Sequence, residues 1–199
     1  MSESAESHDK SYEPSVLKSS IEALKNGNII LYPTDTIWGL GCDPFDEQAV
    51  KRLRSIKDRA EDKPFILLVD SQKRLKDYIN KIHPRVETLL HHHQRPLTIV
   101  YHSVRNIPDY LKADDGSVAI RIVMDDFCKD MIAEFDKPVI STSANVSGET
   151  PPAHFGEVSS EIIQQVDHVV KYRQDEQQEA VPSTIATYDE EGELQFLRE

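Results

Sequence analysis

The sequence predicts an α/β protein made of one domain, in which helices flank a mixed sheet. Short apolar runs of strand length alternate with segments whose apolar residues recur at helical spacing. Two late strand patterns around Glu191-Gly192 indicate a hairpin, which argues for a mixed rather than a purely parallel sheet. Residues 1–13 lack periodic apolar positions and predict a mobile N-terminal arm, so the domain is assigned to residues 14–199.

Helices and strands are expected to alternate through this domain. Ser15 and Asp46 can cap the first two helices, and Gly39 with Gly41 indicates a polar turn after the first strand. Further helices are expected within residues 71–79, 84–94, 125–135 and 157–165, and strands within residues 29–32, 65–69, 97–101, 118–123, 139–140, 166–172, 183–188 and 194–197.

Charge and hydropathy disfavour several classes of protein. Lys plus Arg is 23 against 35 for Asp plus Glu, and this net charge of −12 argues against a large RNA-binding surface. The longest apolar run, 64–69, is far shorter than the roughly 18 residues of a membrane span, and the polar N-terminus resembles no secretion signal. A cytoplasmic protein without membrane contact is therefore expected. Cys42 and Cys128 form no CxxC pair and indicate reduced thiols.

Two polar loops follow apolar strands and are candidates for ligand binding. Residues 33–41 and 141–148 are rich in hydroxyl groups and glycine, and loops at strand ends bind ligands in open α/β sheets. Their chemistry suits phosphates, hydroxyl groups or a zwitterion, and it contains no nucleophile and base pair. Both loops could equally be tight turns, because the same residue types are common there.

Several cations could bind an anionic ligand. Lys57, Arg59 and Lys63 lie close together in the chain, which suits a polyphosphate, although a solvated helix end gives the same pattern. Arg121 faces opposite its apolar neighbours in a predicted strand, so it faces either solvent or a carboxylate or phosphate in a pocket. The triplet 91–93 of histidines cannot face one ion from a helix, so no metal site is predicted.

Together these motifs resemble the YrdC-like family of threonylcarbamoyl-AMP synthases in its short, single-domain form. The resemblance covers residues 15–198 and rests on several motifs in the same order. They are Tyr32-Pro33-Thr34-Asp35-Thr36-Ile37-Trp38-Gly39-Leu40-Gly41, Lys57-Asp58-Arg59, Pro96-Leu97-Thr98, Arg121, Ser143-Ala144-Asn145-Val146-Ser147-Gly148 and Pro182-Ser183-Thr184-Ile185.

The resemblance implies a twisted sheet with a central groove and a nucleotidyltransferase reaction. L-Threonine, bicarbonate and ATP, the last with Mg²⁺, would give threonylcarbamoyladenylate and pyrophosphate. A separate tRNA threonylcarbamoyl transferase complex would then transfer the threonylcarbamoyl group to an adenosine of tRNA. Direct tRNA binding by this chain is expected to be weak or absent, in agreement with its negative charge.

The resemblance also assigns roles to residues of this chain. Lys57 and Arg59 are implied to be catalytic, because they would neutralise the triphosphate. ATP would be bound by Lys57, Arg59, Lys63, Thr98, Asn145 and Arg198, and threonine by Thr36, Arg121, Ser143 and Ser183. One departure is that many family members have a histidine where this chain has Leu68. Another is Pro151-Pro152-Ala153, which lacks a hydroxyl group that the family usually has.

Two other functions remain compatible with the same fold. The first is an RNA-binding or ribosome-associated protein without synthase activity, which the residues Lys57, Arg59, Ser143 and Asn145 and the acidic charge disfavour. The second is a paralogue that acts on another carbamoyl substrate, as in hydrogenase maturation. That role normally comes with zinc-finger and acylphosphatase segments, which this sequence does not contain.

Overall fold

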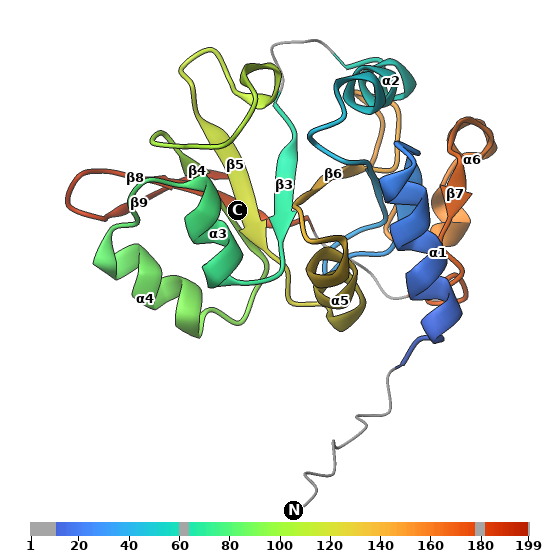
Figure 1. Cartoon of the computed structure of the whole chain (residues 1–199), viewed down its shortest axis with the longest axis horizontal. Helices are drawn as coiled ribbons and strands as arrows, with labels where there is room; N and C mark the ends of the chain where they lie inside the picture. The colour runs from blue at the N-terminus through green and yellow to red at the C-terminus, as the bar shows by residue number, and fades with distance from the viewer. Residues whose placement is uncertain (1–10, 60–63, 178–181, 199) are drawn as a thin grey trace, which may run out of the picture.

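The structure of the protein is a computed structural model that describes residues 11–59, 64–177 and 182–198 (Figure 1). Within these residues nine strands form one twisted sheet in the order β7-β1-β2-β6-β3-β5-β4-β8-β9. The strands are β1 (Ile30–Tyr32), β2 (Gly39–Gly41), β3 (Ile66–Val69), β4 (Leu97–Tyr101), β5 (Val118–Ile122), β6 (Val139–Ser143), β7 (His168–Val169), β8 (Thr184–Tyr188) and β9 (Leu194–Arg198). The helices are α1 (Pro14–Lys25), α2 (Glu47–Lys57), α3 (Gln72–Tyr78), α4 (Pro84–His92), α5 (Asp126–Phe135) and α6 (Ser160–Gln165), with 3-10 turns at Asp109–Leu111 and Phe155–Glu157.

The sheet is mixed, which confirms the predicted fold class. Three strand pairs are parallel, namely β1 with β7, β3 with β5 and β4 with β8, and the remaining pairs are antiparallel. The late hairpin pairs β8 with β9, as the turn at Glu191-Gly192 predicts. None of the helices that the described residues form is long and apolar enough to cross a membrane.

Two hydrophobic clusters lie on opposite faces of the sheet. Side chains alternate along β3, so Leu67 joins the cluster under α2, α3 and α4, whereas Leu68 joins the cluster under α1 and α5. Helices α1 and α5 pack side by side (Figure 1). Thr98 and Arg121 pair in register with each other, and Arg121 pairs with Leu68, so these polar side chains share the face of α1 and α5.

Four local predictions are corrected by the structure. Pro14 is the first residue of α1, and Glu13 precedes it without a side-chain cap, so Ser15 is not the capping residue. The predicted turn at Gly39 and Gly41 is strand β2. Strand β6 continues through Ser143, although its hydroxyl-rich end predicted a loop. The strand expected over residues 166–172 is reduced to the two residues of β7.

Close approach of neighbouring strands explains why glycine occupies β2. A Cβ atom built on Gly41 would lie 2.5 Å from the carbonyl oxygen of Ile140 and 2.8 Å from the ring of Tyr32. Glycine is required here by packing rather than by backbone conformation. The capping expectation for Asp46 is confirmed, because Asp46 accepts hydrogen bonds from two backbone amides of α2. Asp125 caps α5 in the same way and accepts one hydrogen bond from the amide of Cys128.

The start of the described chain packs against the domain. Tyr12 belongs to the arm predicted for residues 1–13, and it is buried against Phe127 and Tyr172 with ring centroids 5.2 Å and 5.6 Å away. Residues 1–10 lie outside the described residues, so the mobility of the arm stays a prediction. Both cysteines are free and buried, as the absence of a CxxC pair indicates.

Substitution of Gly41 tests the packing of β2. We expect Gly41→Ala to lower the free energy of unfolding by about 2 kcal/mol, because the added methyl group meets backbone and ring atoms that cannot move away. Urea unfolding measures this change. The matched control is Gly156→Ala, whose methyl group would lie 3.3 Å from the side chain of His154. Equal midpoints for the two variants would contradict the close approach.

Candidate functional site

The ammonium group of Lys57 joins the end of α2 to the loop after β6. Its Nζ donates hydrogen bonds to the carbonyl oxygens of Ser143, at 2.6 Å, and of Asn145. Ser143 Oγ and Asn145 Oδ1 lie 3.3 Å and 3.2 Å from the same nitrogen. In return the amide of Ser147 donates to the carbonyl oxygen of Lys57 at 2.9 Å. Two motifs that are far apart in sequence are therefore bonded to each other.

The amphipathic pattern of α2 explains why this lysine points inward. Val50, Leu53 and Lys57 recur at helical spacing on the buried face, so the aliphatic part of Lys57 continues an apolar stripe and its ammonium group extends beyond it. The residue is 1% exposed, which excludes the solvated helix end that charge alone allowed. Burial lowers the pKa of Lys57 to about 8; the positive charge of Arg59 adds to this, and Glu149 opposes it.

The side chain of Asn145 organises the same loop. Its Nδ2 donates to the carbonyl oxygens of Val146 and Glu149, at 2.8 Å each, while its Oδ1 faces Lys57. Residues 144–149 therefore curl around one amide group. Ser143 lies at the end of β6 opposite Gly39 of β2, so its hydroxyl is placed by the sheet rather than by the loop.

A buried ion pair joins β5 to the loop between β1 and β2. Arg121 Nη2 lies 3.0 Å from Asp35 Oδ1, and the two side chains are 3% and 5% exposed. Asp35 Oδ2 accepts a hydrogen bond from the amide of Met124 at 3.0 Å. Arg121 Nε, Arg121 Nη2 and Asp35 Oδ1 make no directional hydrogen bond with any residue that the structure describes. Buried polar atoms that lack a hydrogen-bond partner indicate a site for a polar ligand, which would supply the missing hydrogen bonds.

The loop between β1 and β2 is folded by its own hydroxyl groups. Thr34 Oγ1 accepts a hydrogen bond from the amide of Thr36 at 3.0 Å and donates one to the carbonyl oxygen of Ile37 at 2.8 Å. The two threonine hydroxyls are 2.9 Å apart and buried. The single tryptophan, Trp38, packs against Phe155 with ring centroids 4.9 Å apart, so it belongs to the core rather than to an open pocket wall.

A third polar cluster lies on β4, β8 and β9. Thr98 Oγ1 and Ser183 Oγ are 2.8 Å apart, and Arg198 donates two hydrogen bonds to the carbonyl oxygen of Ser183. The register of β8 and β9 shifts at Leu197, so that Arg198 pairs with Ile185 and shares the face of Thr98. The pKa of Arg198 is lowered by burial and by the charge of Arg121, which indicates that the two guanidinium groups are near each other.

Most of the residues assigned from the sequence thus fall into three polar clusters, one around Lys57, one around Ser183 and one around Arg121. Arg59 donates to the carbonyl oxygen of Pro64 at 2.8 Å and lies over the ring of Phe65. Lys63 lies outside the described residues, so its predicted role cannot be placed. Leu68, the first departure noted from the resemblance, is fully buried in the core and offers no polar contact. The residues brought into these clusters are Thr36, Lys57, Thr98, Arg121, Ser143, Asn145, Ser183 and Arg198.

Sequence reasoning missed two charged residues of the site. Asp35 lies inside a motif that had been recognised, but nothing in the sequence indicates its partner Arg121. Arg173 lies in a polar segment rich in Glu and Gln, and it donates to the carbonyl oxygen of Thr34 at 3.1 Å and forms an ion pair with Asp125. No local pattern distinguishes this arginine from any other residue of a polar loop.

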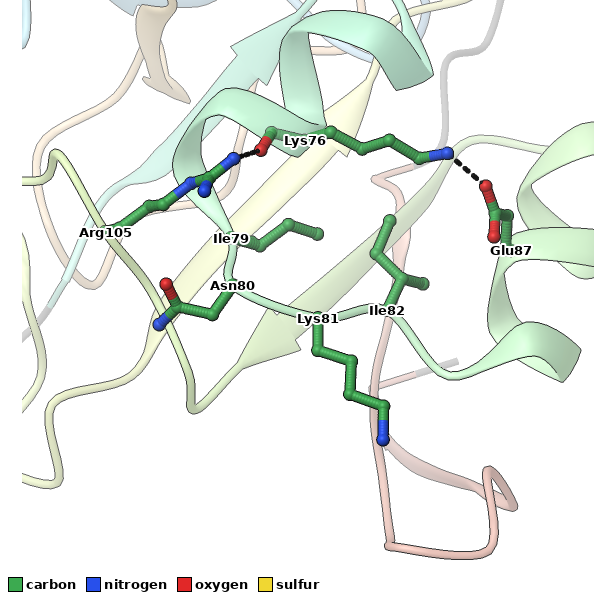
Figure 2. A pocket seen from close by; sticks show the side chains of 7 residues that line it. All are labelled: Lys76, Ile79, Asn80, Lys81, Ile82, Glu87 and Arg105. Carbon is green, nitrogen blue, oxygen red and sulfur yellow. Dashed lines mark hydrogen bonds and ion pairs between the residues drawn. The ribbon is translucent and has the colours of Figure 1, made fainter.

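No group of histidine, cysteine and acidic residues among the described residues could hold a metal ion. Three hollows that the described residues line include none of the polar residues of these clusters. One of about 260 Å³ lies beside the end of α3, where Lys76 is paired with Glu87 and Arg105 donates to the carbonyl oxygen of Lys76 (Figure 2). Another lies along α4 and the third lies beneath Phe196. The central groove implied by the resemblance stays a prediction.

The lowered pKa of Lys57 predicts a pH-dependent stability. Between pH 8 and 10.5 the unfolded chain holds this proton and the folded chain loses it, so the free energy of unfolding rises with pH in this window. The free energy of unfolding of wild type, minus that of Lys57→Met, should therefore increase by about 2 kcal/mol from about pH 7.5 to 9.5.

Urea unfolding at a series of pH values measures this difference. The control is Lys51→Met, because Lys51 is an exposed residue of the same helix, paired with Glu47. Parallel stability curves for wild type and both variants would contradict a buried, charged Lys57.

Comparison with known proteins relates the whole domain to one family. The sequence model of the Sua5_yciO_yrdC family, described as "Telomere recombination", matches residues 22–199. A "Threonylcarbamoyl-AMP synthase" of Pseudoalteromonas translucida (strain TAC 125) is 32% identical over 161 residues, which are 79% of this chain and 86% of that protein.

Two solved structures share the fold. P. abyssi Sua5 complexed with L-threonine superposes with a TM-score of 0.81 at 24% identity and covers 89% of this chain, while this chain spans only 52% of that protein. E. coli YciO superposes with a TM-score of 0.81 at 19% identity, covering 94% of this chain and 90% of its own length. The family match over nearly the whole chain and the shared fold lead to one conclusion: this chain belongs to the Sua5/YciO/YrdC family.

Proposed function

We propose that this chain is an L-threonylcarbamoyladenylate synthase, which joins L-threonine, bicarbonate and ATP and releases pyrophosphate. The observation that carries the proposal is the buried Arg121–Asp35 pair, whose polar atoms lack directional partners among the described residues, and the bonding of Lys57 to the loop of Ser143 and Asn145 supports it. The name of the relative from Pseudoalteromonas translucida supports the same reaction. The acidic net charge argues against the alternative of an RNA-binding module.

The buried ion pair suits an amino acid as substrate. Arg121 keeps guanidinium nitrogens, and Asp35 keeps a carboxylate oxygen, that have no directional partner among the described residues. A zwitterion could place its carboxylate on Arg121 and its ammonium group on Asp35. The hydroxyl groups of Thr36 and Ser143, together with that of Ser183, would then meet the remaining polar groups of threonine.

The reaction requires positioning and charge neutralisation more than an acid and a base. The ammonium group of threonine loses a proton, and the free amine then forms a bond to the carbon of carbon dioxide, so that threonine and bicarbonate together give a carbamate, one water and one proton released to solvent. A carbamate oxygen then forms a bond to the α-phosphorus of ATP, while the bond to the bridging oxygen breaks and pyrophosphate leaves. Lys57 and Arg59 would lower the energy of the negative charge that develops on the phosphates. Lys57 would also fix the loop that approaches the nucleotide.

The nucleotide would be held by the other predicted residues. Asn145 with its loop would approach ATP from one side, and Thr98 with Arg198 from the other. Mg²⁺ would arrive as part of the MgATP substrate, with phosphate oxygens as its ligands, which fits the lack of a cluster of metal ligands among the described residues.

A downstream tRNA threonylcarbamoyl transferase complex would receive the adenylate. With 35 acidic against 23 basic residues, this chain would bind tRNA weakly or not at all, so a partner would deliver the product. A cytoplasmic location fits that role.

Pyrophosphate release tests the proposed reaction. Release from ATP should require both L-threonine and bicarbonate, and Lys57→Ala and Arg59→Ala should each reduce turnover by about 10²-fold or more, because a lost charge at a transferring phosphoryl group costs about 3 kcal/mol. Lys51→Ala, on the exposed face of the same helix, should keep wild-type turnover. Release that is independent of threonine would contradict the synthase, and unchanged turnover in both variants would contradict the assigned roles.

Comparison of amino acids tests how the site recognises threonine. Serine keeps the hydroxyl group and loses a methyl group worth about 1 kcal/mol, so it should react within roughly tenfold of threonine. Valine keeps the shape and loses the hydroxyl group, so it should be poorer by about 10²-fold if a buried hydrogen bond is lost. The same pyrophosphate assay compares the three. A valine rate that equals or exceeds the serine rate would show that the site recognises the shape of the side chain rather than its hydroxyl group.

A further inference from the structure

Arg173 has an unusual backbone conformation next to the proposed substrate loop. It lies between β7 and β8, and its φ of 58° falls in the left-handed region, which costs free energy for a residue other than glycine. Its side chain is one quarter exposed and none of the roles proposed above uses it. A strained residue beside a site requires surrounding contacts that compensate for the strain.

The guanidinium group of Arg173 connects three segments. Nη1 donates to the carbonyl oxygen of Thr34 at 3.1 Å and lies 3.3 Å from Asp125 Oδ2, and Nε pairs with Glu176. Asp125 is the N-cap residue of α5, and its Oδ1 accepts a hydrogen bond from the amide of Cys128 at 2.9 Å. The arginine thus fastens the backbone of the loop after β1 to the start of a core helix.

Aromatic packing holds the backbone of this segment in place. The ring of Tyr172 contacts Phe127, with centroids 5.3 Å apart, as well as Tyr12. The hydroxyl of Tyr172 is 2.6 Å from Ser11 Oγ. The residue just before Arg173 is therefore anchored to α5 and to the first described residues of the chain, which fixes the direction in which the arginine side chain leaves.

The hydrogen bond from Arg173 to the carbonyl oxygen of Thr34 affects the positions of several side chains. Thr34 Oγ1 folds the turn that places Thr36, and the next residue, Asp35, orients Arg121. Displacement of the Thr34 carbonyl would move Asp35, Thr36 and Arg121, which are three of the side chains proposed to face threonine. The nucleotide contacts proposed for Asn145 and Lys57 depend on α2 and β6 instead.

We propose that Arg173 is a positioning residue for the loop of residues 34–36, and that it sets the affinity for the amino-acid substrate without touching it. The substrate class rests on the proposed function, whereas the mechanical link between Arg173 and the loop does not. A loss of Arg173 should therefore act on threonine binding and leave the nucleotide side unchanged.

Kinetics of an arginine series tests the link to substrate. Arg173→Ala should raise the KM for threonine about tenfold, the effect of one lost charge-assisted hydrogen bond, and leave kcat and the KM for ATP within about twofold. Arg173→Lys should fall between wild type and Arg173→Ala, because one ammonium group can replace Nη1 at Thr34 and Asp125 but supplies no second nitrogen for Glu176. The control is Arg105→Ala, which also removes hydrogen bonds to backbone carbonyls but far from the loop (Figure 2).

Amide hydrogen exchange tests the link without reference to activity. In Arg173→Ala the amides of residues 34–37 should exchange at least about tenfold faster, at an unchanged urea midpoint, whereas Arg105→Ala should leave them unchanged. Unchanged exchange in Arg173→Ala overturns the proposal, as does a loss of kcat with an unaltered KM for threonine. If wild type releases no pyrophosphate, the synthase proposal fails, and the exchange rates still decide whether Arg173 holds the loop.

Discussion

The buried ammonium group of Lys57 is the constraint on which the position of the loop after β6 depends. An isolated charge in this position would be costly, and it is tolerated because oxygen atoms of Ser143 and Asn145 surround it. The same bonds determine where the loop after β6 lies relative to α2. The charge of Lys57, the position of the loop after β6 and the end of α2 therefore depend on one another, so a change in one should change the other two.

The layers of the fold explain why polar side chains collect where they do. Helices α1 and α5 cover the part of one sheet face that carries Leu68 and Val139, and the strand register continues this face to Arg121 and Thr98. Both of these polar side chains are buried. The extra residue in β9 places Arg198 on the same face, so a local irregularity adds a second guanidinium group to the site.

Local chemistry predicted much of the fold, and long-range contacts account for what it missed. Asp46 and Asp125 are caps that act over three residues, so their roles could be inferred from sequence. Gly41 was assigned to a turn because glycine is common there, whereas packing against β6 decides its role. The motifs indicated Lys57, but the bond from Lys57 to the loop of Asn145 and the Arg121–Asp35 pair join segments far apart in the chain, which no spacing rule predicts.

The Arg121–Asp35 pair illustrates how such a contact can serve binding rather than stability. A buried ion pair gains little stability unless both partners are fully hydrogen-bonded, and this pair leaves donor and acceptor atoms without directional partners among the described residues. Its stabilising contribution is therefore small, while the cost of removing either charge alone is large. Asp35 instead holds the guanidinium group ready in a fixed orientation. A ligand that carries both charges would complete the missing bonds without reorganising the site, which is the condition for tight binding at a preformed site.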